Sequence, residues 1–103
     1  MARRKRTGQR YEIIEAYLGG KRKLPLLKEE VWRDELGMVT RYSLAYIDPD
    51  RFAGDNGRVL GYDNAHGHHH RHYCGEQTTF TFRGFDRLLK QFEDEVISLG
   101  RAR

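Results

Sequence analysis

Residues 38–47 read MVTRYSLAYI, and this stretch decides the fold. Large aromatic and apolar side chains alternate with small or polar ones, as Tyr42, Leu44 and Tyr46 do with Arg41, Ser43 and Ala45. Successive side chains of an extended chain point to opposite faces, so this alternation predicts a β-strand with one buried face. Residues 26–34 also favour a strand, and the turn signal at Leu36-Gly37 predicts a hairpin at residues 35–37 that pairs the two.

Two further strands are predicted downstream of this hairpin. Asp48-Pro49 ends the strand described above, and Gly54-Asp55-Asn56-Gly57 predicts a tight turn, because Asp and Asn followed by Gly tolerate positive φ. Residues 58–62 then read as a third strand. Residues 78–82 (TTFTF) alternate cleanly and predict another.

Two helices are predicted, one before the strands and one after them. Apolar residues recur at helical spacing near the C-terminus, at Phe85, Leu88, Leu89, Phe92, Val96 and Leu99. Gly100 is the predicted C-terminal cap of this helix. A shorter run of helical spacing, ended by Gly19-Gly20, predicts a helix over residues 9–18. The predicted fold class is α+β, with a small antiparallel β-sheet of about four strands, the C-terminal amphipathic helix packed on one face and a short N-terminal helix.

The composition is typical of one small folded domain over residues 1–103. Aromatic residues make up 12% of the chain and charged residues 33%, which excludes a disordered polymer. No apolar run approaches the roughly 20 residues of a membrane helix, so no membrane partner is expected. The basic start has no apolar stretch behind it, and Cys74 is the single cysteine, so a cytoplasmic location is expected.

Positive charge is concentrated near the N-terminus. Residues 1–23 hold eight Lys and Arg against two acidic residues, and residues 1–9 are predicted to be a basic, disordered arm. Such arms attract polyanions through phosphate neutralisation. The candidate RNA-binding residues are the cations of this arm and two on predicted strands: Arg3, Arg4, Lys5, Arg6, Arg41 and Arg58. A solvated tail, or a tail that binds an acidic protein, is the alternative explanation.

All five histidines lie within residues 66–72. If residues 68–74 are extended, the side chains divide between two faces: His68, His70, His72 and Cys74 on one, and His69, Arg71 and Tyr73 on the other. The first face suggests a metal site held by His68, His70 and His72, although no further ligand is identifiable outside this segment. Our leading expectation is that the protein uses no metal and no cofactor.

The same residue types suit acid–base chemistry on RNA. Imidazole titrates near physiological pH, so it takes up and releases protons readily, and RNA supplies its own nucleophile in the 2′-hydroxyl. We predict His70 and His72 as the acid–base pair, with Arg71 or Arg58 for the phosphate and His69 in reserve. Tyr62 is a candidate proton donor, and Asp63 is either a catalytic group or a turn-capping residue. Histidines that only satisfy hydrogen bonds in a packed loop are the structural alternative.

Three tyrosines have two readings. Tyr42, Tyr46 and Tyr62 either present a stacking platform for unpaired bases or lie in the core under the last helix. Trp32 carries no clear signal in the sequence, and Cys74 has no obvious base beyond its imidazole neighbours.

Several motifs together resemble the TumE-like family of small proteins, which are toxins of bacterial toxin–antitoxin pairs. The similar segments are RYSLAYI at 41–47, DNGRVL at 55–60, YDNAH at 62–66 and the histidine run that ends at His72. The resemblance covers roughly residues 30–99 and implies a small basic toxin encoded beside a helix-turn-helix antitoxin that binds it. The matching positions are Tyr62, Asp63, Asn64, His66, His69, His70, Arg71 and His72, and their roles come from the chemistry above.

The leading hypothesis is a cytoplasmic toxin that acts on RNA or the ribosome. It would be either a metal-independent endoribonuclease or a binder that blocks translation. The alternatives are a non-enzymatic nucleic-acid-binding regulator and a metal-binding histidine-cluster protein. The expected partners are RNA or the ribosome and the helix-turn-helix antitoxin, and homodimerisation is left open.

Overall fold

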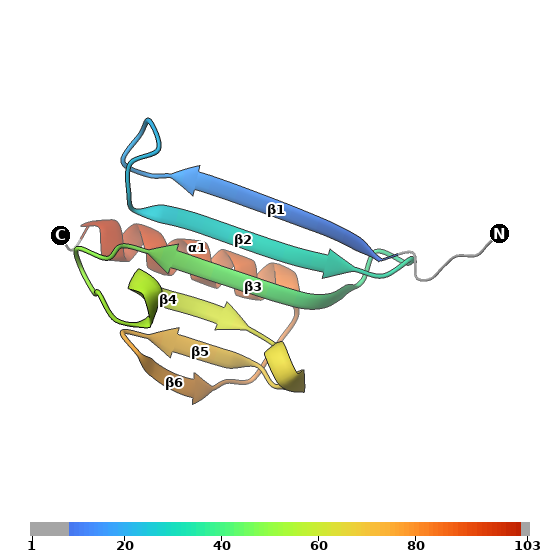
Figure 1. Cartoon of the computed structure of the whole chain (residues 1–103). Coiled ribbons are helices and arrows are strands. Elements are labelled where there is room, and N and C mark those ends of the chain that lie inside the picture. The colour runs from blue at the N-terminus through green and yellow to red at the C-terminus, as the bar shows by residue number, and fades with distance from the viewer. Residues whose placement is uncertain (1–8, 102–103) are drawn as a thin grey trace.

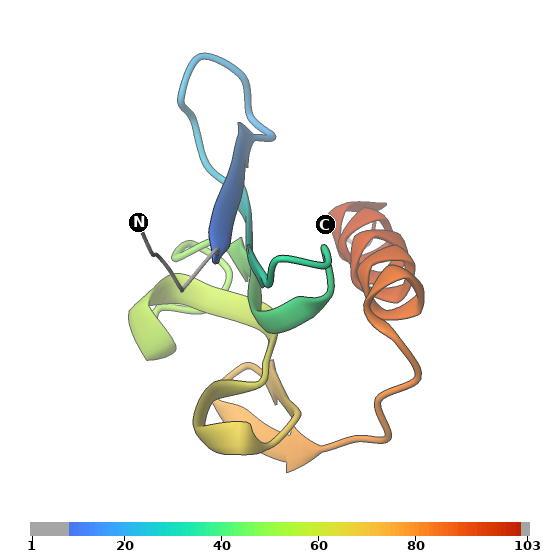
Figure 2. The ribbon, with the colours of Figure 1, turned by 90° about the vertical axis from the view of Figure 1, so that its right-hand side faces the viewer.

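The computed structural model describes residues 9–101, which form one antiparallel sheet with one helix against one of its faces (Figures 1 and 2). The elements follow the chain as β1 (Arg10–Tyr17), β2 (Leu26–Arg33), β3 (Val39–Ile47), β4 (Arg58–Asp63), β5 (His70–Tyr73), β6 (Glu76–Thr79) and α1 (Phe85–Arg101). The candidate cations Arg3, Arg4, Lys5 and Arg6 lie outside the described residues. So does the predicted disordered arm, apart from Gln9.

The six strands lie side by side in sequence order, so each pairs with its neighbour through a local turn. The predicted hairpin between β2 and β3 is confirmed. Its turn is held by Asp34, whose Oδ1 accepts hydrogen bonds from the backbone N–H groups of Leu36 (2.9 Å) and Met38 (3.0 Å). The tight turn before β4 is also confirmed, because Asp55, Asn56 and Gly57 all have positive φ.

The core lies between α1 and one face of the sheet. The face of β3 that carries Tyr42, Leu44 and Tyr46 is buried, as the alternation in the sequence predicts. Leu60 and Tyr62 continue this face on β4, and α1 covers it with the buried side chains of Leu88, Phe92 and Val96. The opposite face is not covered by any helix of the described chain (Figure 2). We call it the open face.

The predicted N-terminal helix is wrong, because the segment forms β1. Its residues pair with β2 without interruption, from Arg10 opposite Arg33 to Tyr17 opposite Leu26. An isolated helix of this length is marginal in water, whereas a strand beside β2 satisfies its backbone groups at once. Tyr and Ile also favour strands, so the helical spacing was coincidental.

The number of strands is six rather than about four. The two additional strands are β1 and β5, and the predicted strand over residues 78–82 is replaced by β6, which ends at Thr79. Phe80 and Phe82 leave the sheet and pack against the core. Gly100 is not a cap, since it lies inside α1 and lacks the positive φ of a left-handed cap.

The sheet has two unlike edges. β6 is a short edge of four exposed residues, Glu76 to Thr79. β1 is a longer edge of eight residues, and Tyr11, Ile13 and Ile14 on it are 44–59% exposed. No helix of residues 9–101 is long and apolar enough to cross a membrane.

Candidate functional site

The β4–β5 pairing divides the predicted site residues between the two faces of the sheet. His70 lies opposite Asp63, His72 opposite Gly61, and Arg71 opposite Tyr62. The predicted alternation of this segment is therefore confirmed for the residues of β5. His70 and His72 belong to the open face, whereas Arg71 points toward α1 and hydrogen-bonds to it.

On the open face, Asp63 connects three potential proton- or phosphate-handling groups. Its Oδ2 lies 2.9 Å from Nε2 of His72 and 3.9 Å from Nη1 of Arg58, and its Oδ1 lies 4.0 Å from Nδ1 of His70. The four side chains are 13–24% exposed, which is partly shielded but within reach of solvent. We call Arg58, Asp63, His70 and His72 the open-face cluster.

Local backbone features build this cluster. Gly61 lies in the middle of β4, between Arg58 and Asp63. A Cβ at this position would be 2.7 Å from Cδ of Arg58, so the glycine leaves room for the arginine to lie across the sheet. Arg58 is also held by Asp55, with Nη2 2.8 Å from Oδ2. The backbone N–H of Ala65 donates to Oδ1 of Asp63 at 3.1 Å. Asp63 therefore caps a turn with one oxygen and contacts His72 with the other. The turn-capping interpretation is confirmed, and the catalytic role stays a prediction.

A second polar group lies under α1, and we call Tyr62, Arg71, Gln91 and Glu95 the helix-side network. The hydroxyl of Tyr62 donates to Oε1 of Glu95 at 2.5 Å and accepts from Nε of Arg71 and Nε2 of Gln91, each at 3.0 Å. Arg71 also bonds Glu95 through Nη2 at 3.0 Å. Burial, followed by the bond to Glu95, raises the pKa of Tyr62.

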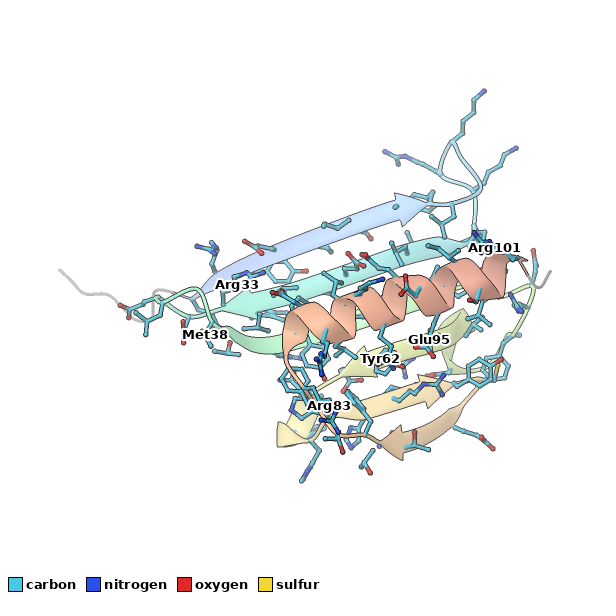
Figure 3. All side chains as sticks on the ribbon, turned by 180° about the vertical axis from the view of Figure 1, so that it is seen from behind. Arg33, Met38, Tyr62, Arg83, Glu95 and Arg101 are labelled. Atoms are coloured by element: carbon cyan, nitrogen blue, oxygen red, sulfur yellow. The ribbon has the colours of Figure 1, made fainter. Side chains whose placement is uncertain are left out.

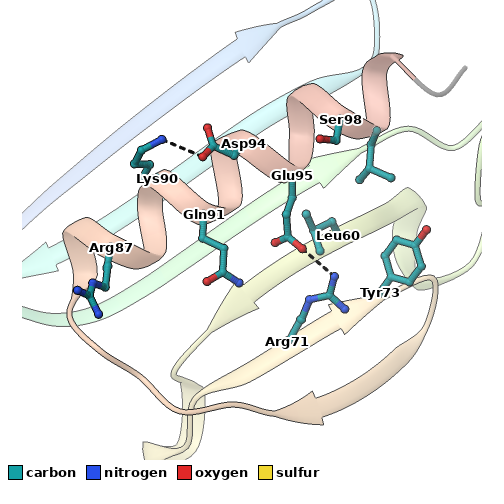
Figure 4. Close-up of a pocket in the computed structure, with 10 residues that line it drawn as sticks. Leu60, Arg71, Tyr73, Arg87, Lys90, Gln91, Asp94, Glu95 and Ser98 are labelled. Atoms are coloured by element: carbon teal, nitrogen blue, oxygen red, sulfur yellow. Dashed lines mark hydrogen bonds and ion pairs between the residues drawn. The ribbon is translucent and has the colours of Figure 1, made fainter.

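The helix-side network borders a groove of about 580 Å³ between α1 and β4–β5 (Figures 3 and 4). Arg71, Gln91 and Glu95 line it, and so does Tyr73. Sequence reasoning found Tyr62 and Arg71 but missed Gln91 and Glu95. Those two stand on the polar side of the amphipathic helix, where the sequence offers no sign that they turn toward a strand.

His69 occupies a third environment, apart from both groups. Its ring stacks on Phe82 with centroids 4.1 Å apart, and its Nδ1 shares a 2.7 Å hydrogen bond with the hydroxyl of Tyr42. Burial, and then the charge of neighbouring His70, lowers the pKa of His69. These contacts give His69 a packing role, and its reserve catalytic role stays a prediction.

The geometry does not favour a metal site on the histidine segment. Across residues 9–101, no group of three His, Cys, Asp or Glu side chains is arranged to hold a metal ion. His68 is exposed, and its ring centroid lies 6.0 Å from that of His70.

The stacking-platform reading of Tyr42, Tyr46 and Tyr62 is wrong, because each is 1% exposed and belongs to the core. Helix α1 covers the face of the sheet that carries them. Exposed aromatic side chains occur instead on β1, at Tyr11 and Tyr17, and on β5, at Tyr73.

These features define a small α+β protein with an antiparallel meander, one covering helix and a carboxylate–histidine–arginine cluster on the uncovered face. A family model described as Toxin TumE matches residues 14–99, and the chain belongs to this toxin family, as its motifs predicted. The match also includes the second half of β1, residues 14–17, which the sequence resemblance had left out. No curated protein and no solved structure matches the chain.

Proposed function

We propose that the protein is a toxin that acts on RNA, and that the open-face cluster cleaves phosphodiester bonds without a metal ion. One observation carries this proposal: Asp63 lies within 2.9–4.0 Å of two imidazoles and a guanidinium, on the face that α1 leaves uncovered. A general base, a general acid and a cation are the groups that RNA cleavage by its own 2′-hydroxyl requires.

In the proposed reaction, one imidazole of the His70–His72 pair takes the proton of the 2′-hydroxyl. The 2′-oxygen bonds to phosphorus, and the bond from phosphorus to the 5′-oxygen breaks. The other imidazole gives its proton to that leaving oxygen, so the products carry a 2′,3′-cyclic phosphate and a 5′-hydroxyl. The centroids of the two rings lie 6.3 Å apart, which is close enough for both imidazoles to act on one phosphodiester.

The other members of the cluster support this pair. Asp63 orients His72 through their 2.9 Å contact, and Arg58 stabilises the charge that develops on the phosphate oxygens. Arg58 takes this role in place of Arg71, since Arg71 faces α1 and lies on the other side of the sheet from His70 and His72. Tyr62 is likewise committed to the helix-side network, so we propose no proton transfer for it.

The test is cleavage of single-stranded RNA in the presence of a chelator, with growth inhibition as a second readout. We expect His70→Ala, His72→Ala and Asp63→Asn each to lower the cleavage rate by at least about 100-fold, the usual scale of lost acid–base catalysis. His66→Ala is the matched control, because His66 is an exposed histidine of the same segment. Undiminished cleavage by both histidine variants would refute the mechanism.

We further propose that a helix-turn-helix antitoxin from a neighbouring gene binds and neutralises this toxin in the cytoplasm. Family membership supports this pairing. Co-expression of the adjoining reading frame with the tagged toxin should restore growth and yield a complex at fixed stoichiometry. Growth inhibition that persists beside an expressed neighbour would count against it.

A further inference from the structure

The open face carries an aromatic patch that the sequence did not indicate, formed by Tyr11, Trp32 and Arg41. These residues lie side by side on β1, β2 and β3, because Trp32 pairs with both Tyr11 and Arg41. The rings of Tyr11 and Trp32 have centroids 4.9 Å apart, and Cζ of Arg41 lies 4.7 Å from the centroid of the Trp32 ring. Tyr11 is 48% exposed and Arg41 is also exposed.

The aromatic patch is on the same face as the open-face cluster and a short distance from it. Asp63 on β4 pairs with Ser43 on β3, and Ser43 pairs with Glu30 on β2. Trp32 lies two residues beyond Glu30 on β2, so it is two strands away from Asp63 and two residues along the strand. Standard strand spacing and rise place their backbones about 12 Å apart. The small side chain of Ser43 lies between them, so no bulky group separates the two sites on β3.

We propose that the aromatic patch is the base-stacking subsite of this protein for single-stranded RNA, whose backbone then crosses Ser43 to the open-face cluster. The inference rests on the proposed RNA-directed function and adds the form of the substrate and where it is held. Unpaired bases stack on aromatic rings and guanidinium planes, whereas paired bases keep those surfaces covered. The patch offers both kinds of plane in contact with each other.

Charge on this face suits an RNA strand. The nearest carboxylate, Glu30, is compensated, since it accepts a 2.8 Å hydrogen bond from Tyr11 and lies 3.9 Å from Nζ of Lys28. Arg41 is in no ion pair within residues 9–101, so its charge is available to a phosphate. In the sequence, four Lys and Arg residues occur in the eight positions before Gln9, directly ahead of the strand that carries Tyr11.

The test uses Trp32 as its own reporter, because it is the only tryptophan of the chain. A labelled 12-nucleotide oligouridylate is titrated into the His70→Ala protein, which keeps the aromatic patch and removes the proposed cleavage. We expect saturable quenching of Trp32 fluorescence together with a rise in the anisotropy of the label. Tyr11→Ala and Arg41→Ala should each weaken binding by at least about fivefold, the low end for one stacked base.

The matched control is Arg83→Ala, which removes an exposed arginine from the connection between β6 and α1, and it should bind as the parent does. Thermal melts of each variant identify any that fail to fold. Trp32→Phe keeps a ring in the patch, so its affinity, measured by the anisotropy of the labelled RNA, should fall less than that of Tyr11→Ala. RNA binding without quenching, or with unchanged affinity in both patch variants, would overturn the inference. A patch covered by a protein partner instead would appear as no quenching by RNA and quenching by the purified neighbour-gene product.

This design separates the two proposals. Quenching and patch-dependent binding by a wild-type protein that does not cleave RNA would support the inference and refute the cleavage mechanism. Cleavage that depends on His70 and His72 but not on Tyr11 and Arg41 would do the reverse.

Discussion

Glu29 is a buried carboxyl group whose ionisation should set the pH dependence of folding. It lies on the helix-facing side of β2, is 5% exposed, and its Oε2 is a buried oxygen with no hydrogen-bond partner in the described part of the chain. Burial first, and then the hydrogen bond and charge of Glu93, raise the pKa of Glu29 from 4.5 to about 8. Within residues 9–101, Glu29 is in no ion pair with a cation that would relieve the negative charge once this proton is lost.

The direction of the effect follows from the two pKa values. Below pH 4.5 the group is protonated in both states and contributes no pH dependence. Between pH 4.5 and about 8 the folded protein retains a proton that the unfolded chain has lost, so the free energy of unfolding decreases as the pH rises. At about 1.36 kcal/mol per pKa unit, the ceiling is about 5 kcal/mol, and local relaxation should reduce the observed value to a few kcal/mol.

The perturbation is Glu29→Gln, which keeps the shape of the side chain and removes the ionisation. Urea unfolding at pH 4, 7 and 9 should show a variant that is close to the wild type at pH 4 and more stable by about 2–5 kcal/mol at pH 9. Glu76→Gln, at an exposed position of β6, is the control and should leave the wild-type pH dependence intact. Wild-type and Glu29→Gln stabilities that run parallel from pH 4 to pH 9 would refute the reasoning.

Three further predictions concern the polar groups around β4. Tyr62→Phe removes a hydroxyl that makes three hydrogen bonds and should lower the free energy of unfolding by about 1–3 kcal/mol in urea titrations, and an unchanged midpoint would contradict this. Gly61→Ala should push Arg58 aside and lower the rate of RNA cleavage by more than any loss of folded protein, followed by the melting temperature, accounts for. Full activity would show that Arg58 is dispensable. His69→Phe should preserve the stack on Phe82, lose the bond to Tyr42 and destabilise the fold by about 1–3 kcal/mol while cleavage by the folded protein persists. If His69 were catalytic, His69→Phe would instead abolish cleavage while the protein kept its wild-type stability.

The central strands and the helix were predictable because their patterns are strong and are enforced by burial. The alternation in residues 38–47 places three large side chains in the core, and the apolar spacing after Phe85 matches the buried side of α1. β1 was not predictable in this way. Almost all its residues are exposed, so burial imposes no period on its sequence, and its pairing with β2 is a long-range property that local spacing does not reveal.

The site was predictable only in part, for a related reason. Alternation in β5 correctly separated His70 and His72 from Arg71, since strand geometry alone determines it. The partners of these residues come from elsewhere. Arg58 reaches Asp63 by lying over Gly61, and Glu95 reaches Arg71 from a helix far along the chain. The proposed stacking surface was missed because Trp32 acquires its neighbours from two other strands.

The long outer edge of β1 has a practical consequence. Eight residues there leave one row of backbone amides and carbonyls without a neighbouring strand in residues 9–101, beside half-exposed Ile13 and Ile14. Such an edge is a template for backbone hydrogen bonding with an extended segment of another chain, so molecules in concentrated preparations should associate through it. Ile13→Lys would discourage this edge-to-edge pairing of chains and leave the core beneath α1 unchanged, because Ile13 lies on the open face.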